Sequence, residues 1–290
     1  MKFVKHVIEQ INNMLKTNKL KTIRLQESGI FKEKRKPLIV VSLTSYPGRI
    51  DVVHKTITTL LHQSLKPDVV ILWLAYEQFR NKSLPIDLIN LKKYGLEIKW
   101  CDDIRSYKKL IPALELFPDD IIVTADDDNY YENDWLEKLY NSYIKHPDCI
   151  SVHKATKFVY SEDGWNWIAG GREYHKAPSF ANKLVGVGGV LYPPHSLYKD
   201  ICNRHLFIKL SPTNDDQWFW FMAVLNGTKI CVVDDPIIHS KPVEGTLKDG
   251  LWRVNDQGDK LFSKQFAALL SYYPEFETKI IEEKNSTYND

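Results

Sequence analysis

The chain between residues 37 and 146 alternates short apolar runs with segments whose apolar residues recur at helical spacing. The runs are typical of buried parallel strands, and they are PLIVVSL (37–43), DVVILWL (68–74), LEIKW (96–100) and DIIVTA (120–125). The helical spacing is found in residues 50–61, 106–117 and 133–146. Strands that alternate with helices in this way form a parallel sheet covered by helices. The sequence therefore predicts an α/β fold with a Rossmann-like, mostly parallel sheet flanked by helices.

Beyond residue 150 this alternation stops, and a mixed second half is expected. Residues 151–171 are polar and aromatic, and they predict irregular strands and loops. A glycine-rich turn feeds a strand in LVGVGGVLYPP (184–194), and NDDQWFWFMAVLNG (214–227) has helix start and stop residues. The organisation expected is a basic N-terminal segment (1–36), a first half (37–150), a second half (151–245), and a C-terminal loop with helices in the same domain (246–290).

Composition narrows the class of protein. The 290 residues are 43% hydrophobic and 26% charged, which is ordinary for a globular chain. The net charge of +2 gives no overall field for nucleic acid, so no nucleic-acid partner is expected. There is no apolar run long enough for a transmembrane helix and no secretory signal pattern, so a cytoplasmic protein is expected. The cysteines form no CxxC pair, which predicts buried, reduced thiols and no zinc site; they are Cys101, Cys149, Cys202 and Cys231.

The N-terminal segment is basic and amphipathic. Residues 1–37 contain ten Lys or Arg side chains and three Glu. Phe3, Val7, Ile11 and Leu15 recur every four residues, as on one face of a helix. One interpretation is a helix that packs on the domain. The other is an interfacial helix that contacts anionic lipid at the inner face of the plasma membrane.

Three adjacent aspartates, Asp126, Asp127 and Asp128, follow the fourth predicted strand. Parallel sheets bind ligands at the carboxyl ends of their strands. A helix cap needs only one carboxylate, and a calcium loop is excluded because its sixth position is Tyr131 and no helix precedes it. A divalent cation that shares its shell with phosphate suits carboxylates at this place. The triplet therefore favours a site for Mg²⁺ or Mn²⁺.

Six segments occur in order within residues 40–240, and they are VVSLTSYPGRI, SYKKLIPAL, IIVTADDDNYY, VGVGGVLYPP, NDDQWFW and IIHS. In this order they resemble the GT-A fold glycosyltransferases, close to family 2 and to the bacterial enzymes of polysaccharide synthesis. The resemblance implies a metal-dependent enzyme that moves a sugar from a nucleotide-diphosphate sugar to a hydroxyl group. It implies a glycan or lipid-linked acceptor, as in capsule or lipopolysaccharide synthesis, and slightly favours UDP-sugars as donors.

The resemblance also implies roles for the metal-site residues. Asp128 corresponds to the direct ligand of Mn²⁺ or Mg²⁺. Asp126 corresponds to a second metal-site residue that holds the ribose or a metal-bound water, and Asp127 to a sugar contact. His239 corresponds to a C-terminal histidine that reaches the metal in many enzymes of this fold.

Further residues correspond to the family's nucleotide-sugar contacts. The turn after the first strand implies that Thr44, Tyr46 and Arg49 lie near the base and ribose. Asp102 or Asp103 corresponds to the residue on the base, and Lys109 to a phosphate contact. The glycine loop implies close approach of the sugar to Gly188 and Gly189. The family has an acidic turn after the second strand. It is missing here, because the end of that strand and the turn read LWLAYEQF (72–79), with Leu74, Ala75 and Tyr76 at the turn.

NDDQW (214–218) resembles the motif that supplies the family's general base. Asp216 corresponds to the carboxylate that takes the acceptor proton, and Asp215 to the neighbour that orients it or binds acceptor. A carboxylate base opposite a leaving group implies inversion at the anomeric carbon. As an alternative interpretation, the two aspartates only stabilise the first turn of a helix.

Two other functions compete with this reading. A nucleotidyltransferase acting on a sugar phosphate shares a sheet with carboxylates at strand ends, but TSYPGR (44–49) has only one glycine in its turn. A non-catalytic carbohydrate-binding protein could use the many aromatic side chains as stacking platforms. It would need neither the aspartate triplet nor the NDD sequence.

Overall fold

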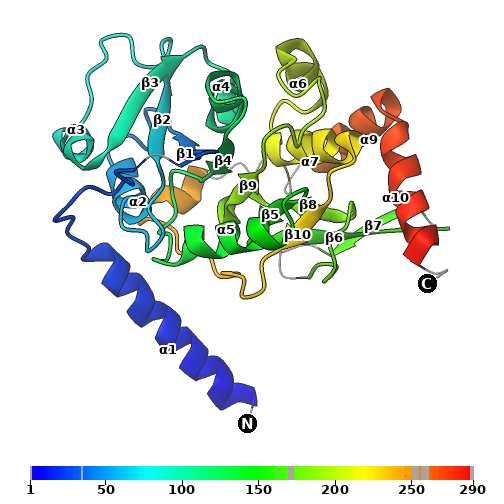
Figure 1. The fold of residues 1–290 in the computed structure, drawn as a ribbon, viewed down its shortest axis with the longest axis horizontal. Helices are drawn as coiled ribbons and strands as arrows, with labels where there is room; N and C mark the ends of the chain where they lie inside the picture. Colours follow the sequence, from blue (N-terminus) through cyan, green and yellow to red (C-terminus); the bar gives the residue numbers. More distant parts are fainter. Residues whose placement is uncertain are drawn as a thin grey trace.

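The computed structural model describes residues 2–33, 35–162, 164–168, 173–249, 255 and 261–287 (Figure 1). Its main sheet has seven strands, and the predicted α/β fold with a mostly parallel sheet is confirmed. Strand β9 pairs antiparallel with both of its neighbours, while the other paired strands are parallel. The order is β10 (Ile230–Val232), β5 (Ile150–Val152), β9 (Val190–Tyr192), β4 (Ile121–Thr124), β1 (Ile39–Thr44), β2 (Val69–Ala75) and β3 (Leu96–Cys101).

Helices cover both faces of this sheet, and each face has its own apolar core. Alternate residues of the strands enter opposite cores, as Val40 and Val41 of β1 do. One core includes α2 (Val53–Leu60) and α5 (Trp135–Lys145), and the other includes α4 (Ile111–Leu116), α7 (Asp215–Asn226) and α9 (Leu261–Tyr272). The remaining helices are α1 (Lys2–Lys21), α3 (Ile86–Asn90), α6 (Arg204–Leu210) and α10 (Glu275–Thr287). Short 3₁₀ helices are η1 (Leu91–Tyr94), η2 (Arg105–Lys109), η3 (Gly186–Gly188) and η4 (Thr246–Asp249).

Two elements differ from the sequence prediction. The helix expected over 106–117 is divided into η2 and α4, because proline fits only the first turn of a helix and Pro112 sets where α4 begins. The irregular strands and loops expected over residues 151–171 instead contribute regular strands to a second sheet, ordered β7 (Gly164–Ile168), β6 (Ala155–Ser161) and β8 (Asn182–Leu184). Phe158 and Trp167 are cross-strand partners there, with ring centroids 5.5 Å apart. Such aromatic pairs stabilise neighbouring strands.

The segment 241–246, here called the covering segment, lies against the turn after β4. The Val243 N–H donates to the Asp128 carbonyl at 2.8 Å, and the Tyr130 N–H donates to the Lys241 carbonyl at 2.8 Å. Asn129 also forms an isolated bridge with Pro242. The aspartate turn is therefore held on one side by a segment more than a hundred residues away in sequence.

The cysteines are reduced, but they are not all buried as predicted. Cys231 is buried, Cys101 and Cys149 are half-buried, and Cys202 is exposed. Burial raises the pKa of the half-buried Cys101 to about 11, which keeps its thiol protonated.

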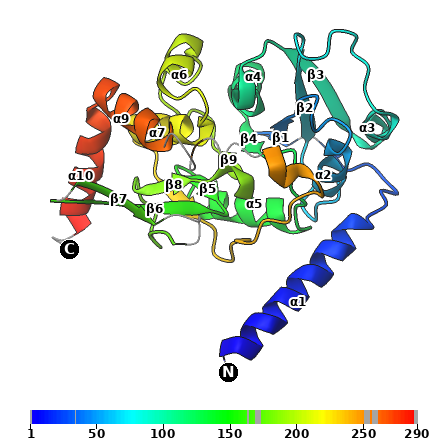
Figure 2. The same ribbon diagram turned by 180° about the vertical axis from the view of Figure 1, so that it is seen from behind.

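Helix α1 extends away from the sheet, and both Figure 1 and Figure 2 show its N-terminus far from the rest of the chain. Within the part of the chain that the structure describes, no helix is both long and apolar enough to cross a membrane.

Candidate active site

The aspartate turn lies at the carboxyl end of β4, beside the loop that leaves β1. The two strands pair in parallel with Ser42 opposite Thr124, so their following loops start at the same edge of the sheet. Residues 44–49 and 125–128 are consequently neighbours, although about eighty residues separate them in sequence. This is the edge where parallel sheets bind ligands.

Asp127 points into the protein rather than toward solvent. One carboxylate oxygen accepts a hydrogen bond from Ser45 Oγ at 2.5 Å, and the other accepts one from Arg49 Nη1 at 2.7 Å. Its backbone carbonyl accepts a bond from Thr56 Oγ1 at 3.0 Å. Because both oxygens are engaged and the residue is buried, Asp127 fixes the turn to the β1 loop. The sugar contact expected of Asp127 does not agree with this arrangement.

Asp126 and Asp128 are the more open members of the triplet. Their side chains are 29% and 21% exposed, compared with 7% for Asp127. Arg49 Nη1 lies 2.9 Å from Asp128 Oδ2, so one guanidinium holds two of the three aspartates. The Asp126 N–H donates to Tyr131 Oη at 2.8 Å, which closes the turn. The turn thus separates one structural carboxylate from two that are accessible.

Lys109 joins the aspartate turn to the start of α7. Its Nζ lies 3.1 Å from Asp126 Oδ1, 2.9 Å from Asp215 Oδ2 and 3.6 Å from Asp216 Oδ1. The lysine is 5% exposed and so has little contact with solvent. The structure therefore places Lys109 among carboxylates of the protein, where the sequence led us to expect a phosphate contact. Its ammonium group is the shared partner of both acidic motifs.

The helix start explains the difference between the two α7 aspartates. The Asn214 side chain caps α7 by accepting a bond from the Gln217 N–H. This places Asp215 and Asp216 in the first turn, where negative charge is favourable. Asp215 is turned inward, with its side chain 8% exposed, whereas that of Asp216 is 22% exposed. Asp216 Oδ2 accepts a bond of 2.7 Å from the Gly186 N–H. Asp216 is thus the accessible carboxylate of the pair.

The charges of the cluster shift its pKa values. Burial alone would lower the pKa of Lys109, but Asp126, Asp215 and Asp216 together raise it well above its usual value. The ammonium therefore stays protonated. Burial raises the pKa of Asp215, and Lys109 opposes this change. Burial, followed by the charge of Asp126, raises the pKa of Asp128 to about 7 although Arg49 acts in the opposite direction.

The charge balance of the cluster fits a divalent cation. Among the described residues, these ion pairs join five carboxylates to two cations; the carboxylates are those of Asp126, Asp127, Asp128, Asp215 and Asp216, and the cations are Arg49 and Lys109. With all five ionised, the excess is three negative charges at a partly buried place, and the raised pKa values of Asp128 and Asp215 reflect this crowding. Asp126 and Asp128 supply hard oxygen donors of the type that Mg²⁺ and Mn²⁺ prefer.

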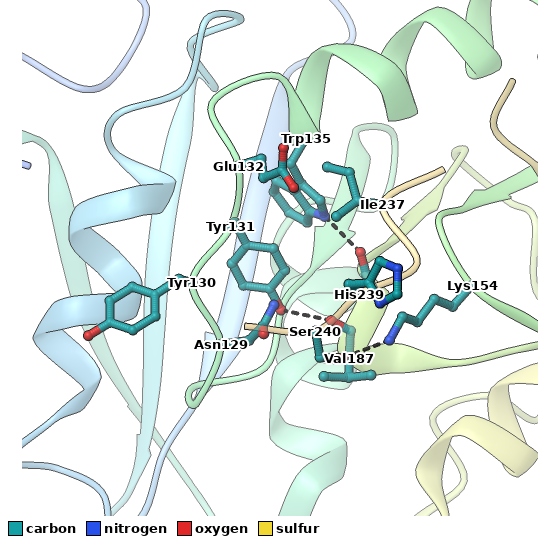
Figure 3. A pocket seen from close by; sticks show the side chains of 11 residues that line it. Asn129, Tyr130, Tyr131, Glu132, Trp135, Lys154, Val187, Ile237, His239 and Ser240 are labelled. Carbon is teal, nitrogen blue, oxygen red and sulfur yellow. Dashed lines mark hydrogen bonds between the residues drawn. The ribbon is translucent and has the colours of Figure 1, made fainter. Parts of the chain in front are cut away.

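His239 is not part of a metal-binding group in this structure. Within the described ranges, no three His, Cys, Asp or Glu side chains are arranged to hold a metal. The predicted set of Asp126, Asp128 and His239 is therefore not assembled. His239 instead lines a small pocket behind the aspartate turn, together with Lys154 and Ser240 (Figure 3).

That pocket is too small for a sugar. Its volume is about 10 Å³, which is room for about one water molecule. Figure 3 shows the Trp135 ring on one side and Lys154 on the other, with Tyr130 pointing away from the group. Lys154 Nζ donates to Ser240 Oγ at 2.6 Å. The pocket therefore serves the packing of the segment around His239 and not the binding of a donor.

The glycine loop packs against protein groups. A Cβ at Gly189, whose φ is +91°, would lie 2.4 Å from the Trp135 ring, and one at Gly188 would lie 2.9 Å from Lys154. Both glycines are buried, so the expected approach of a sugar to Gly188 and Gly189 does not account for them. Gly186 is the glycine beside the acidic cluster, since a Cβ there would lie 2.5 Å from Asp216 Oδ1 and 2.8 Å from Lys109 Nζ.

Of the remaining predicted nucleotide contacts, those after β1 lie beside the aspartate turn, and those after β3 lie outside the acidic cluster. Thr44 Oγ1 donates to the Trp73 carbonyl at 2.9 Å, and Arg49 lies over the Tyr46 ring at 5.7 Å, so these residues form the β1 side of the site. Asp102 is at the surface, paired with Arg204 at 3.3 Å. Asp103, the alternative, binds Lys108 Nζ at 2.7 Å. Neither carboxylate belongs to the Lys109 cluster.

Sequence reasoning missed the residues that hold the site together. Ser45 and Tyr131 bind the aspartate turn through hydroxyl groups, and Gly186 binds Asp216 through its backbone. Of these three residues, only Gly186 belongs to a sequence motif, the glycine-rich turn within LVGVGGVLYPP (184–194). The hydroxyl contacts depend on the register of the two loops, which no local pattern reports.

His153 is a buried structural histidine. Its Nε2 donates to the Trp135 carbonyl at 3.0 Å, and its Nδ1 accepts from the Ile237 N–H at 3.1 Å. These partners require the neutral ring with its proton on Nε2. Burial lowers the pKa of His153 from 6.5 to about 4. The imidazole thus connects the start of α5 to Ile237, which lies just before the covering segment.

This histidine predicts a loss of stability in mild acid. An unfolded chain protonates His153 near its usual pKa of 6.5, while the folded chain does not until about 4. The free energy of unfolding therefore decreases as pH falls from 6.5 toward 4, and between about pH 7 and pH 5 it decreases by about 2 kcal/mol. Urea unfolding at several pH values should show a shallower dependence in His153→Gln and an unchanged one in the control, exposed His146→Gln. Equal slopes in wild type and His153→Gln would contradict the assignment.

Comparisons with known proteins show similarity to solved structures but not to known sequences. No protein-family model matches the chain, and no curated protein sequence matches it. Among solved structures it is similar to the mannosyltransferase PcManGT from Pyrobaculum calidifontis in complex with GDP-Man and Mn²⁺. The two share 12% sequence identity with a TM-score of 0.47, over 93% of this chain and 74% of that chain. A similarity of this extent says nothing about what the present chain binds.

Proposed function

We propose that the protein is a metal-dependent glycosyltransferase that moves a sugar from a nucleotide-diphosphate sugar to a hydroxyl group of a glycan or lipid-linked acceptor. The observation that carries the proposal is the position of Lys109, whose ammonium lies between Asp126 of the aspartate turn and the Asp215–Asp216 pair. One cluster thus connects the aspartate turn, which would bind the diphosphate of the donor, to the Asp215–Asp216 pair, which would supply the general base. Sugar transfer from a nucleotide donor needs both within one site.

The aspartate turn would hold the diphosphate end of the donor. Asp126 and Asp128 are the accessible carboxylates there, and Arg49 and Asp127 fix their positions. Mn²⁺ or Mg²⁺ bound by Asp126 and Asp128 would neutralise the diphosphate leaving group as the glycosidic bond breaks. Thr44 and Tyr46 flank Ser45, which binds Asp127, and they would border the nucleoside.

Asp216 would act as the general base. Its side chain is accessible, and the Gly186 N–H and Lys109 hold it in place. The carboxylate takes the proton of the acceptor hydroxyl while that oxygen forms a bond to the anomeric carbon. The bond from this carbon to the nucleoside diphosphate breaks at the same time, and the configuration inverts. Asp215 is buried next to Asp216 and binds the same ammonium group of Lys109, and through it would orient Asp216.

Product analysis tests the proposal against its competitors. The protein is incubated with UDP- and GDP-sugars, with Mn²⁺ or with EDTA, and with nucleoside triphosphate plus sugar phosphate. We expect slow release of nucleoside diphosphate that needs Mn²⁺ and is lost in Asp128→Ala, with surface Asp119→Ala as the matched control. Asp119 is 84% exposed and binds only His195 among the described residues.

Each competing function gives a different product. Pyrophosphate release from the triphosphate would replace the proposal with a nucleotidyltransferase. Binding of a sugar without either product would indicate a carbohydrate-binding protein. Nucleoside diphosphate release that is equal in Asp128→Ala and wild type would also contradict the proposed site.

A further inference from the structure

From residue 12 onward, helix α1 contacts the body of the protein with a face on which two of the three half-buried side chains are polar. From residue 12 onward, where its side chains are described, Asn13, Thr17 and Leu20 are half-buried. They are four and three residues apart, so they form one face of the helix. Met14 and Leu15 lie off this face and are 58% and 57% exposed. In a helix that only packs on its domain, the apolar residues would be the buried ones.

The sequence before residue 12 has apolar residues at the same helical spacing. Phe3, Val7 and Ile11 precede Leu15 at intervals of four residues. The same helix is strongly basic, because residues 2–24 contain six Lys or Arg side chains and one Glu. An apolar stripe on a helix of this charge is complementary to a surface that is both apolar and anionic.

Two ion pairs fix the orientation of α1 on the body. Lys16 Nζ lies 3.1 Å from Glu132, just after the aspartate turn. Lys21 Nζ lies 2.5 Å from Glu244 of the covering segment. Glu132 is also bound by Lys241 at 2.5 Å, and Glu244 by Lys55 at 3.4 Å. The C-terminal half of α1 is therefore attached next to the candidate site, with Met14 and Leu15 facing outward.

We propose that α1 is an in-plane membrane anchor whose exposed apolar stripe inserts into an anionic phospholipid bilayer. The exposed Lys19 and Arg24 contact the lipid phosphates, while Lys16 and Lys21 keep their pairs with the protein. The candidate site is thereby held at the bilayer surface. This surface is separate from the acidic cluster, and lipid binding requires no catalysis.

Vesicle co-sedimentation of the full chain tests the anchor. The vesicles contain either phosphatidylcholine alone or phosphatidylcholine with phosphatidylglycerol. Wild type should bind the anionic vesicles and release them at high salt. Met14→Ser combined with Leu15→Ser changes no charge, and it should weaken binding about tenfold or more, because two side chains no longer enter the bilayer. The matched control, Asn12→Ser with Gln26→Ser, replaces exposed polar residues and should bind as wild type does.

Three results would overturn the proposal. The first is equal binding of wild type and the Met14→Ser, Leu15→Ser variant to anionic vesicles. The second is equal binding of wild type to both vesicle types. The third is that wild type forms a dimer, the serine variant is a monomer, and neither protein binds vesicles. In that case a second copy of the chain, and not lipid, would cover the apolar stripe of α1. Circular dichroism of each variant checks that the fold is retained.

Discussion

Replacing Asp216 by Asn is expected to slow sugar transfer about a hundredfold or more while donor binding is retained. The amide is the same size as the carboxylate and can still accept the bond from the Gly186 N–H. It cannot take a proton from the acceptor hydroxyl. Initial rates of transfer and the donor dissociation constant, measured on the same preparation, separate the two effects.

Asp119→Asn is the matched control for this substitution. It makes the same chemical change at an exposed position outside the cluster, and transfer should remain at the wild-type rate. If Asp216→Asn transfers sugar as fast as the control, Asp216 is not the general base and inversion through it is wrong. Loss of donor binding in Asp216→Asn would instead place the residue in the donor site.

Replacing Lys109 by Met is expected to destabilise the fold by about 3–5 kcal/mol, because it leaves buried carboxylates without their cation. Lys109 is the partner that Asp126, Asp215 and Asp216 share. Urea unfolding provides the free energy. Lys99→Met is the matched control, since among the described residues Lys99 pairs with Glu97 alone, at the surface, and it should cost less than about 1 kcal/mol.

A second variant shows whether charge is the cause. Combining Lys109→Met with Asp215→Asn removes the buried carboxylate together with its cation, and part of the lost stability should return. A loss in Lys109→Met that is no larger than in Lys99→Met would show that the cluster does not stabilise the protein. A double variant no more stable than Lys109→Met would assign the loss to packing of the lysine side chain.

The position of the site could be predicted from the sequence, because it follows from the order of strands. Apolar runs such as residues 37–43 and 120–125 identify parallel strands, and aspartates directly after the second of them must lie at the carboxyl edge. The helix start at Asp215 was equally visible, since cap residues are local. Both predictions depend on short stretches of chain whose meaning does not change with tertiary context.

The connections within the site could not be predicted, because they join residues far apart in sequence. Which aspartate turns inward depends on Ser45 and Arg49, about eighty residues before Asp127. The family resemblance implied a phosphate contact for Lys109, yet both Lys108 and Lys109 are buried against carboxylates of the protein. Hydrophobic periodicity reports which face of an element is buried, but not which charge it meets there.

The aromatic second sheet was missed for a related reason. The pairing of Phe158 with Trp167 requires a register between β6 and β7 that their composition does not specify. His239 was placed by its order among the resembling segments, but its side chain follows the path of the chain around Trp135 and Lys154. Order along the sequence did not determine the direction of that side chain.

Calorimetric titration of a nucleotide-diphosphate sugar into the protein, with and without Mn²⁺, tests the central claim most directly. The charge excess around Asp126 and Asp128 predicts that a UDP- or GDP-sugar binds wild type only when Mn²⁺ or Mg²⁺ is present, and that Asp128→Ala abolishes this binding. Asp119→Ala should bind as wild type does. Metal-independent binding of the donor, or unchanged binding in Asp128→Ala, would contradict the assignment of the aspartate turn.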